Sequence, residues 1–403
     1  IRLWSMGAPP DAEPTFLLRG EVDRQWGISF HPDGRWLANA DRTGVALWPL
    51  ARSYAVVIGD HEKRVYDVRF HPEGRWLASC SLDDTVRIWP LEGEVPPPGR
   101  VLLRDLGKQM LKTAWTPDGE QVLVGTAWSG FRLLSQSGEE SQTVPEGVNY
   151  IEGATISPNG QLAAGVAGVN SPETRILVWD LTSGEIVATL PPKGRFAYRL
   201  QFTGDGHLLS SSEHGLHSLN IATGESELLY QGEVSRFSAN IDRSRVVLID
   251  GIPREAKDPQ RAVILDLNTG EARILGHHGT SVSAVALGRD GTTVVTGDHD
   301  GVVRVGTISD DEPHLLLGHE DRVRAVDIDP LGRWIASGSH DTTIRLWPMP
   351  VLSEPPLHTL PHDELVTKLK TLTNYRVVRS PESTTGWKVV IDPFPGWETV
   401  PSW

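Results

Sequence analysis

Apolar and polar residues alternate over short stretches along most of this chain. Apolar Val65, Val68 and Phe70 are separated by polar positions, a pattern typical of a strand with one buried face. The next residues, Pro72-Glu73-Gly74, favour a tight turn, because proline fixes one backbone dihedral and glycine tolerates a positive φ. This stretch therefore predicts a strand followed by a hairpin turn.

The same unit contains two more predicted strands and a linker. Residues 76–79 form the second, a turn at Asp83-Asp84 follows, and residues 86–89 form the third. A variable linker then leads to a short outer strand, such as 315–317 in a later unit. One four-stranded sheet of this size cannot bury both of its faces, so neighbouring units must cover it.

The unit recurs along the chain. Residues 30–38, 70–78 and 328–336 are close copies, and weaker copies lie at 116–119, 157–160, 203–206 and 288–291, with a degenerate copy at 242–245. When the turn residue is the anchor, the units fall at residues 34, 74, 119, 160, 206, 245, 291 and 332. The spacings of 39 to 46 residues bracket the period of a propeller blade, and eight units are counted.

These residues resemble the WD-repeat family. The family has a structural tetrad of His, Ser or Thr, Asp and Trp, and this sequence contains the full set twice. The first expected tetrad is His61, Ser81, Asp83 and Trp89; the second is His319, Ser339, Asp341 and Trp347. In the other units the tetrad is incomplete. Glu21 replaces His in the first unit, and Gly306 replaces Trp in the unit that contains Asp300. The Trp-Asp dipeptide survives only at Trp179-Asp180.

The resemblance implies an all-β WD-repeat β-propeller built from eight four-stranded repeats. Either all eight close into one ring, or seven blades close and one unit belongs to an upstream ring. The expected boundaries are a remnant of a preceding blade at 1–20, the propeller at 21–361 and a tail at 362–403. Residues 1–4 repeat 344–347, so the chain is expected to begin inside a repeat of a longer protein.

The tail has a different pattern. Residues 363–372 predict a short helix with Asp363 as N-cap, and 375–378 with 387–391 predict a hairpin. The ending, from Leu372 to Trp403, resembles the C-terminal tail of bacterial proteins that join a eukaryotic-type serine/threonine kinase to a WD-repeat array. Its aromatic residues are expected to pack against the propeller.

Charge and composition narrow the partners. The formal net charge is -14, which argues against binding to nucleic acid and to anionic membranes. No apolar run approaches the length of a membrane-spanning helix, and no signal peptide is apparent. Cys80 is the single cysteine, so no intrachain disulfide can form, and a reducing cytoplasmic location fits.

Catalytic and metal sites are disfavoured. The Ser, His and Asp of a tetrad suggest a nucleophilic triad, but a buried hydrogen-bond network that joins loop to strands is the favoured interpretation. His277-His278 and Asp298-His299-Asp300 lie at loop positions without a zinc-binding spacing. The chain lacks the phosphate loop, catalytic loop and metal-binding motif of kinases. We expect no enzyme activity in these residues, no metal and no cofactor.

The start of each first strand should meet one rim of the central channel, where WD-repeat proteins commonly receive peptides. The aromatic and arginine types found there dominate binding energy at interfaces, although packing between blades is the alternative. The expected partner-binding residues are Trp26, Tyr66, Leu111, Glu152, Tyr198, Phe237, Arg324, Arg24, Arg64 and Arg322.

The resulting function is a non-catalytic protein-interaction scaffold, attached to a bacterial signalling kinase. Its arginines suggest an acidic or phosphorylated partner segment. Two alternatives remain open. The same scaffold could be attached to a signalling NTPase or another effector, or the propeller could be an enzyme with an active site at the channel mouth.

Overall fold

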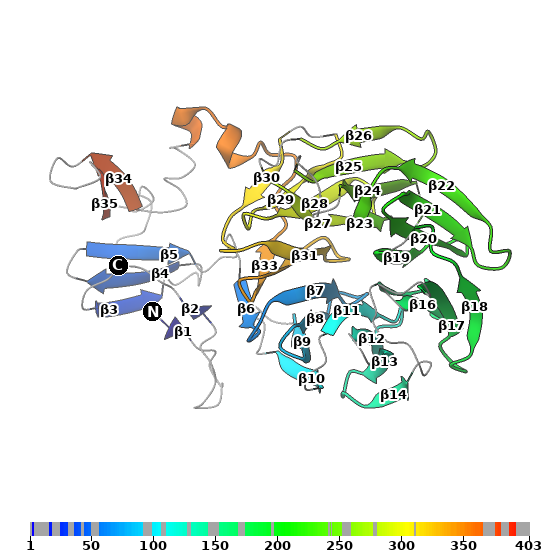
Figure 1. Cartoon of the computed structure of the whole chain (residues 1–403). Helices are drawn as coiled ribbons and strands as arrows, with labels where there is room; N and C mark the ends of the chain where they lie inside the picture. The colour runs from blue at the N-terminus through cyan, green and yellow to red at the C-terminus, as the bar shows by residue number, and fades with distance from the viewer. Residues whose placement is uncertain are drawn as a thin grey trace. The chain divides into compact units, whose positions relative to one another are not determined.

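A computed structural model of the chain shows sheets of antiparallel strands and very little helix (Figure 1). It describes residues 2–3, 16–17, 25–30, 36–41, 44–49, 56–91, 99–105, 110–126, 130–143, 153–167, 174–194, 197–240, 242, 244–251, 259–276, 280–309, 312–365, 375–379 and 387–391. Side chains are described between residues 56 and 365, apart from residue 60 and residues 140–143. The chain divides into two compact units, residues 55–354 and residues 1–54 with 355–403.

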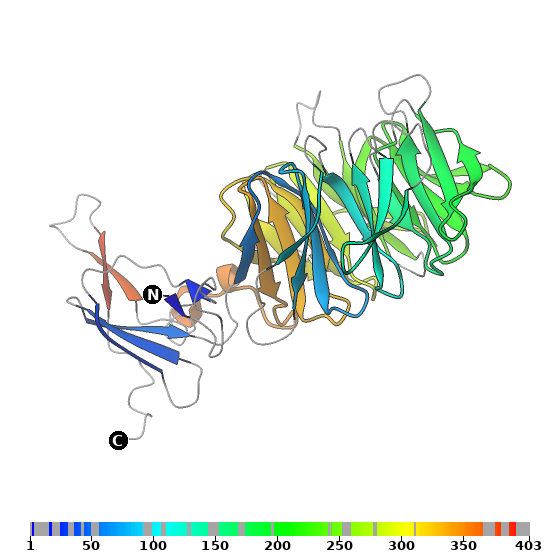
Figure 2. The ribbon, with the colours of Figure 1, turned by 90° about the horizontal axis from the view of Figure 1, so that it is seen from below.

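The larger unit is a ring of seven four-stranded sheets, which we number as blades 1 to 7 (Figures 1 and 2). Blade 1 contains β7 (Val65–Phe70), β8 (Trp76–Ser81), β9 (Thr85–Pro90) and β10 (Arg100–Arg104). Blade 2 contains β11 (Met110–Trp115), β12 (Gln121–Thr126), β13 (Gly130–Ser135) and β14 (Glu140–Thr143). Blade 3 contains β15 (Ala154–Ile156), β16 (Leu162–Ala167), β17 (Arg175–Asp180) and β18 (Ile186–Leu190).

The other four blades repeat this order. Blade 4 contains β19 (Arg199–Phe202), β20 (His207–Ser212), β21 (Gly215–Asn220) and β22 (Ser226–Gln231). Blade 5 contains β23 (Val234–Ala239), β24 (Arg245–Asp250), β25 (Arg261–Asp266) and β26 (Ala272–Ile274). Blade 6 contains β27 (Val282–Leu287), β28 (Thr293–Asp298), β29 (Val303–Thr307) and β30 (His314–Leu316). Blade 7 contains β31 (Val323–Ile328), β32 (Trp334–Ser339) and β33 (Thr343–Pro348).

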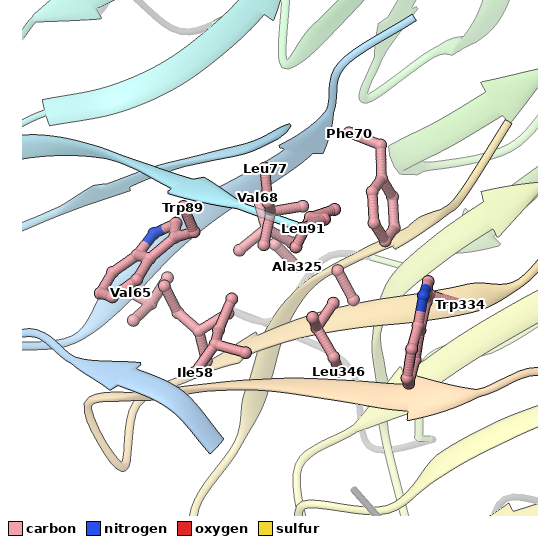
Figure 3. Packing of buried hydrophobic residues seen from close by; sticks show 12 residues of the cluster. Ile58, Val65, Val68, Phe70, Leu77, Trp89, Leu91, Ala325, Trp334 and Leu346 are labelled. Carbon is pink, nitrogen blue, oxygen red and sulfur yellow. The ribbon is translucent and has the colours of Figure 1, made fainter. Parts of the chain in front are cut away.

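The ring closes through a strand from far away in the sequence. The outer strand of blade 7 is β6 (Val56–Asp60), which pairs antiparallel with β33. Blade 7 then lies beside blade 1, and we call this junction the seam. Figure 3 shows its core, where Ile58 of β6 lies with Val65, Trp89 and Leu346. Burying this cluster across two blades stabilises closure and removes the exposed sheet edges of an open ring.

The smaller unit holds the first of the eight counted repeats. Its strands β3 (Gln25–Phe30), β4 (Trp36–Asp41) and β5 (Gly44–Pro49) form a three-stranded sheet, and β1 (Arg2–Leu3) pairs with β2 (Phe16–Leu17). Of the two predicted arrangements, the ring of seven blades with one further unit is confirmed, and eight blades are excluded. The compact ring runs over 55–354, in contrast to the predicted 21–361, because β6 joins blade 7 and leaves β3–β5 with three strands.

The repeat pattern explains the strand positions. Glycines at six of the predicted anchors, from Gly74 to Gly332, have positive φ, as the hairpin turn requires. The predicted terminal hairpin is confirmed as β34 (Tyr375–Arg379) paired with β35 (Trp387–Ile391). A 3-10 turn lies at Leu357–Thr359, and helix begins at residue 362, one residue before the predicted N-cap Asp363. Residues 366–372 of the predicted helix lie outside the described residues.

Candidate partner-binding rim and buried polar networks

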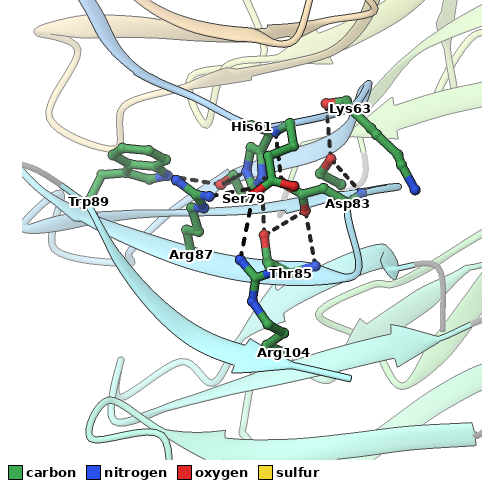
Figure 4. Close-up of polar contacts among 10 residues, drawn as sticks. His61, Lys63, Ser79, Asp83, Thr85, Arg87, Trp89 and Arg104 are labelled. Carbon is green, nitrogen blue, oxygen red and sulfur yellow. Dashed lines mark hydrogen bonds and ion pairs between the residues drawn. The ribbon is translucent and has the colours of Figure 1, made fainter. Parts of the chain in front are cut away.

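A buried polar network ties the loop after β6 to blade 1 (Figure 4). His61 Nδ1 lies 2.8 Å from Asp83 Oδ2 and His61 Nε2 lies 2.8 Å from Ser79 Oγ. Trp89 Nε1 donates to the same hydroxyl at 2.8 Å. Since the carboxylate accepts from Nδ1, a neutral imidazole accepts the Ser79 proton at Nε2, and all these polar groups are satisfied.

Blade 7 repeats this geometry. His319 Nδ1 lies 2.7 Å from Asp341 Oδ2, and His319 Nε2 lies 2.7 Å from Ser337 Oγ, to which Trp347 Nε1 donates at 2.8 Å. Burial lowers the pKa of His319, which favours the neutral ring. Hydrogen bonds from His319 and Thr343 outweigh burial and hold the pKa of Asp341 far below its ordinary value.

The prediction of the serine in each tetrad was wrong by two residues. The bridging hydroxyls belong to Ser79 and Ser337. Ser81 Oγ instead donates to the Lys63 carbonyl at 3.0 Å and accepts from Asp83 N at 3.1 Å, and Ser339 takes the same role in blade 7. Residues 79 and 81 lie on one face of β8, so alternation alone does not distinguish them. Ser79 is fully buried, so its hydroxyl is not accessible to a substrate in this structure.

The rim positions share a backbone feature. A β-bulge interrupts the first strand in blades 1, 2, 5, 6 and 7 and in β3. A bulge of this kind re-aims the extra side chain. The extra residues are Tyr66, Leu111, Ser235, Ser283, Arg324 and Trp26.

Four of the ten predicted rim residues, Trp26, Tyr66, Leu111 and Arg324, are bulge residues, and the predicted residues differ in exposure. Tyr66, Tyr198, Arg322 and Arg324 are half-buried, Arg64 is exposed, and Leu111 is buried. Arg24 and Glu152 lie outside the described residues, and Trp26 lies on β3 without a described side chain.

Phe237 is not a rim residue. It is fully buried in the blade 5 core and pairs with Leu248, the register at which Val68 pairs with Ser79 in blade 1. The degenerate turn at 242–245 has no glycine to mark the anchor, so the count ran two residues late. Ser235 is the true equivalent of Tyr66.

The structure gathers five rim side chains at the seam. Arg324 Cζ lies 4.9 Å from the centroid of the Tyr66 ring, and the Tyr66 ring stacks on His340 with 6.4 Å between centroids and 20° between planes. We define the seam rim as Arg64, Tyr66, Arg322, Arg324 and His340. His340 was missed by the sequence analysis because it lies in the turn after β32, away from the first strands.

The seam rim is electropositive and contains two buried nitrogen atoms without a partner. Burial, and then the charges of Arg64, Arg322 and Arg324, lower the pKa of His340 to about 4. Arg322 Nε and His340 Nε2 are buried without a hydrogen-bond partner.

No metal site or membrane-spanning helix emerges from the part of the chain that is described. No group of three or more His, Cys, Asp or Glu side chains is placed to hold a metal there. Asp298 forms an ion pair with Arg304 and accepts from the backbone of Asp300 and Val302, while His277 and His278 lie outside the described residues. No described helix is long and apolar enough to cross a bilayer.

Comparison with known proteins identifies the repeats. Residues 53–90, 270–305 and 311–348 match the family of WD domain, G-beta repeats. The chain is 26% identical to WD repeat-containing protein SL1-17 of Schistosoma mansoni, over 51% of this chain and 64% of that protein. It is 58% identical over 32 residues to the Ribosome biogenesis protein BOP1 homolog of Dictyostelium discoideum, 8% of this chain and 4% of that protein. It is 31% identical to U3 small nucleolar RNA-associated protein 21 of Saccharomyces cerevisiae, over 21% of this chain and 8% of that protein.

Proposed function

We propose that this seven-bladed WD40 β-propeller is a scaffold that binds a partner protein through the seam rim. The stack of Arg324, Tyr66 and His340 carries the proposal, because arginine and tyrosine supply most of the energy at protein interfaces. The stack is partly exposed and lies on two neighbouring blades, so a partner loop could contact both. The sequence match to WD repeats supports the same function, since WD40 propellers are generally non-catalytic scaffolds.

The chemistry of the seam rim favours an acidic or phosphorylated partner segment. Arg64, Arg322 and Arg324 surround His340 closely enough to depress its pKa, and Asp321 opposes them. A carboxylate or phosphoryl group would accept hydrogen bonds from the guanidinium groups of Arg64, Arg322 and Arg324. The rest of the molecule is acidic, so an acidic partner would be steered towards the rim.

A pull-down with the purified chain tests the scaffold. Tyr66→Ala and Arg324→Ala should each reduce partner recovery at least about tenfold, as expected for an interface hot spot. Tyr230→Ala is the matched control, because Tyr230 is a half-buried tyrosine on the outer strand β22. Recovery that is equal for all three variants would refute the seam rim as the binding surface.

The partner chemistry needs a second measurement. A recovered partner segment, prepared as paired phosphorylated, acidic and neutral peptides, should bind in that order of affinity, and the preference should weaken at high salt. Equal binding of the three peptides would remove the electrostatic part of the proposal and leave the scaffold intact.

Attachment to a bacterial signalling kinase is a separate proposal. It is supported by the residues of the tail alone, since the relatives named above are eukaryotic WD proteins. Attachment to a signalling NTPase is the alternative, and a cytoplasmic location is proposed with either. Sequencing the gene upstream of the codon for Ile1 would distinguish attachment to a kinase from attachment to an NTPase. The match to the ribosome biogenesis protein covers 8% of this chain, which is too little to extend the role of that relative to it.

A further inference from the structure

Charged side chains occur on the inner strands of several blades. The described inner strands are β7, β11, β15, β19, β23, β27 and β31, one in each blade. They carry five cationic residues against two carboxylates, although the whole chain is acidic. The cations are Arg69, Lys112, Arg199, Arg236 and Arg324, and the carboxylates are Asp67 and Asp327.

These side chains converge near the ring axis. Arg236 Nη1 donates to the carbonyl oxygen of Arg324 at 3.0 Å, although blade 6 separates their strands. The Arg236 side chain must therefore pass over β27 on its axial side. Ala284 and Ala286 occupy the positions of β27 that are equivalent to Asp67 and Arg69, and both are small residues of the buried core between blades 6 and 7.

The two carboxylates already have partners. Asp67 lies 3.3 Å from Arg69 and 3.5 Å from Lys112, and it accepts from the backbone of Thr113 at 3.2 Å. Asp327 lies 3.6 Å from Arg69 and accepts from the backbone of Phe70 at 2.8 Å. They balance the charges of Arg69 and Lys112.

Arg199 and Arg236 have no such balance. Among the described residues, no carboxylate lies within 4.0 Å of either guanidinium group. Burial, and then the charges of Arg69 and Arg324, lower the pKa of Arg199 to about 10, although the more distant Asp67 and Asp327 oppose the shift. Burial also lowers the pKa of Lys112 to about 8, with Arg199 adding to the effect and Asp67 opposing it. Neighbouring cations that are partly desolvated repel one another, and a bound anion stabilises their charged forms.

We propose that the ring axis binds a phosphoryl-type oxyanion, held by Arg199 and Arg236 with Lys112 beside them. A tetrahedral dianion suits this set, because guanidinium groups present paired donors and an ammonium group adds a compact charge. The oxyanion could be free phosphate or the phosphoryl group of a side chain that enters from the rim; the second source rests on the proposed scaffold function. Binding would add a bridge between blades 2, 4 and 5.

Binding of inorganic phosphate to the full chain is the first test. Phosphate should raise the Tm by about 4 °C relative to potassium chloride of equal ionic strength, because a ligand of the folded state stabilises it. Titration calorimetry should give a saturable Kd that rises at least about tenfold in Arg199→Gln and in Arg236→Gln. Arg289→Gln removes one exposed arginine from the β27–β28 turn and should leave the Kd unchanged.

A second arm uses a phosphoserine peptide and its unphosphorylated twin. Arg199-dependent binding of phosphate supports a free anion, and Arg199-dependent binding of the phosphopeptide alone supports a partner side chain. Equal Tm shifts in phosphate and chloride, with no Arg199-dependent peptide binding, would overturn the proposal. Tyr66→Ala leaves the axial cations in place, so it separates a failure of the rim from a failure of this site. Far-UV circular dichroism identifies a variant that does not fold, and Arg236→Gln then carries the test.

Discussion

Blades 1 and 7, on either side of the seam, differ from blades 3 and 4 at the same two positions. In blades 1 and 7 a serine on the second strand bridges a histidine and a tryptophan. Blade 3 keeps the tryptophan, Trp179, but Gly165 stands in the serine register, and the indole N–H is buried without a partner. Blade 4 keeps the serine, Ser210, but Leu219 replaces the tryptophan, and the hydroxyl is left unpaired.

Blades 2 and 5 show a third solution, in which both positions are apolar. Val124 and Leu134 occupy them in blade 2, and Leu248 and Leu265 in blade 5. An apolar pair leaves no polar group to satisfy, so it stabilises a blade without the network. The blade 1 network holds the loop that follows β6 at the seam, whereas the blade 7 network holds the loop that follows β30, and its Trp347 packs against blade 6. The network of blade 1 therefore supports closure of the ring.

Loss of Asp83 should have the largest effect. Asp83 accepts from His61, from Thr85 and from the backbone of Glu62, and Asp83→Ala would leave these donors unsatisfied beside the seam. We expect the free energy of unfolding to fall by about 3 kcal/mol, measured by urea denaturation. Asp180→Ala, in an exposed turn of blade 3, should have a much smaller effect, and a comparable loss in both variants would contradict the closure role.

Serine substitutions compare the two kinds of blade directly. Ser337→Ala should cost about 2 kcal/mol, because His319 Nε2 and Trp347 Nε1 lose their shared partner. Ser210→Ala should be neutral or stabilising by about 1 kcal/mol, because it removes a buried hydroxyl that has no partner. Urea midpoints of the two variants, measured side by side, check the sign of the difference. Destabilisation by Ser210→Ala would show that blade 4 satisfies this hydroxyl.

Tryptophan gives a smaller contrast. Trp347→Phe should cost about 1 to 2 kcal/mol through the lost hydrogen bond and the smaller ring. Trp179→Phe should cost less, because its indole N–H is already unpaired and its ring lies 4.7 Å from Phe131 between centroids. Thermal unfolding of both variants measures the difference, and equal losses would show that packing alone sets the cost.

The strengths and failures of the sequence prediction follow from the same residues. The glycines of the predicted turns located the repeat in the sequence, and in the structure these glycines have the positive φ of a hairpin turn. The alternating apolar residues located the strands. The pairing of β6 with β33, which closes the ring, was not predicted. The sequence of a short outer strand does not indicate which strand it pairs with. The axial cations Lys112, Arg199 and Arg236 interrupt apolar strands, a signal that was present in the sequence and was not used. Their convergence depends on ring closure, which no local pattern contains.

The smallest effect concerns pH at the seam rim. His340 has a folded pKa of about 4, so the unfolded chain binds more protons between its ordinary value near 6.5 and about 4. Stability should therefore decline as pH falls through this window, and His340→Gln should remove that part of the decline. His214→Gln is the control, because His214 is exposed and lies in the far blade 4. Urea midpoints at pH 7, 6, 5 and 4.5 give the slope, and an unchanged slope in His340→Gln would show that the three arginines do not hold this ring neutral.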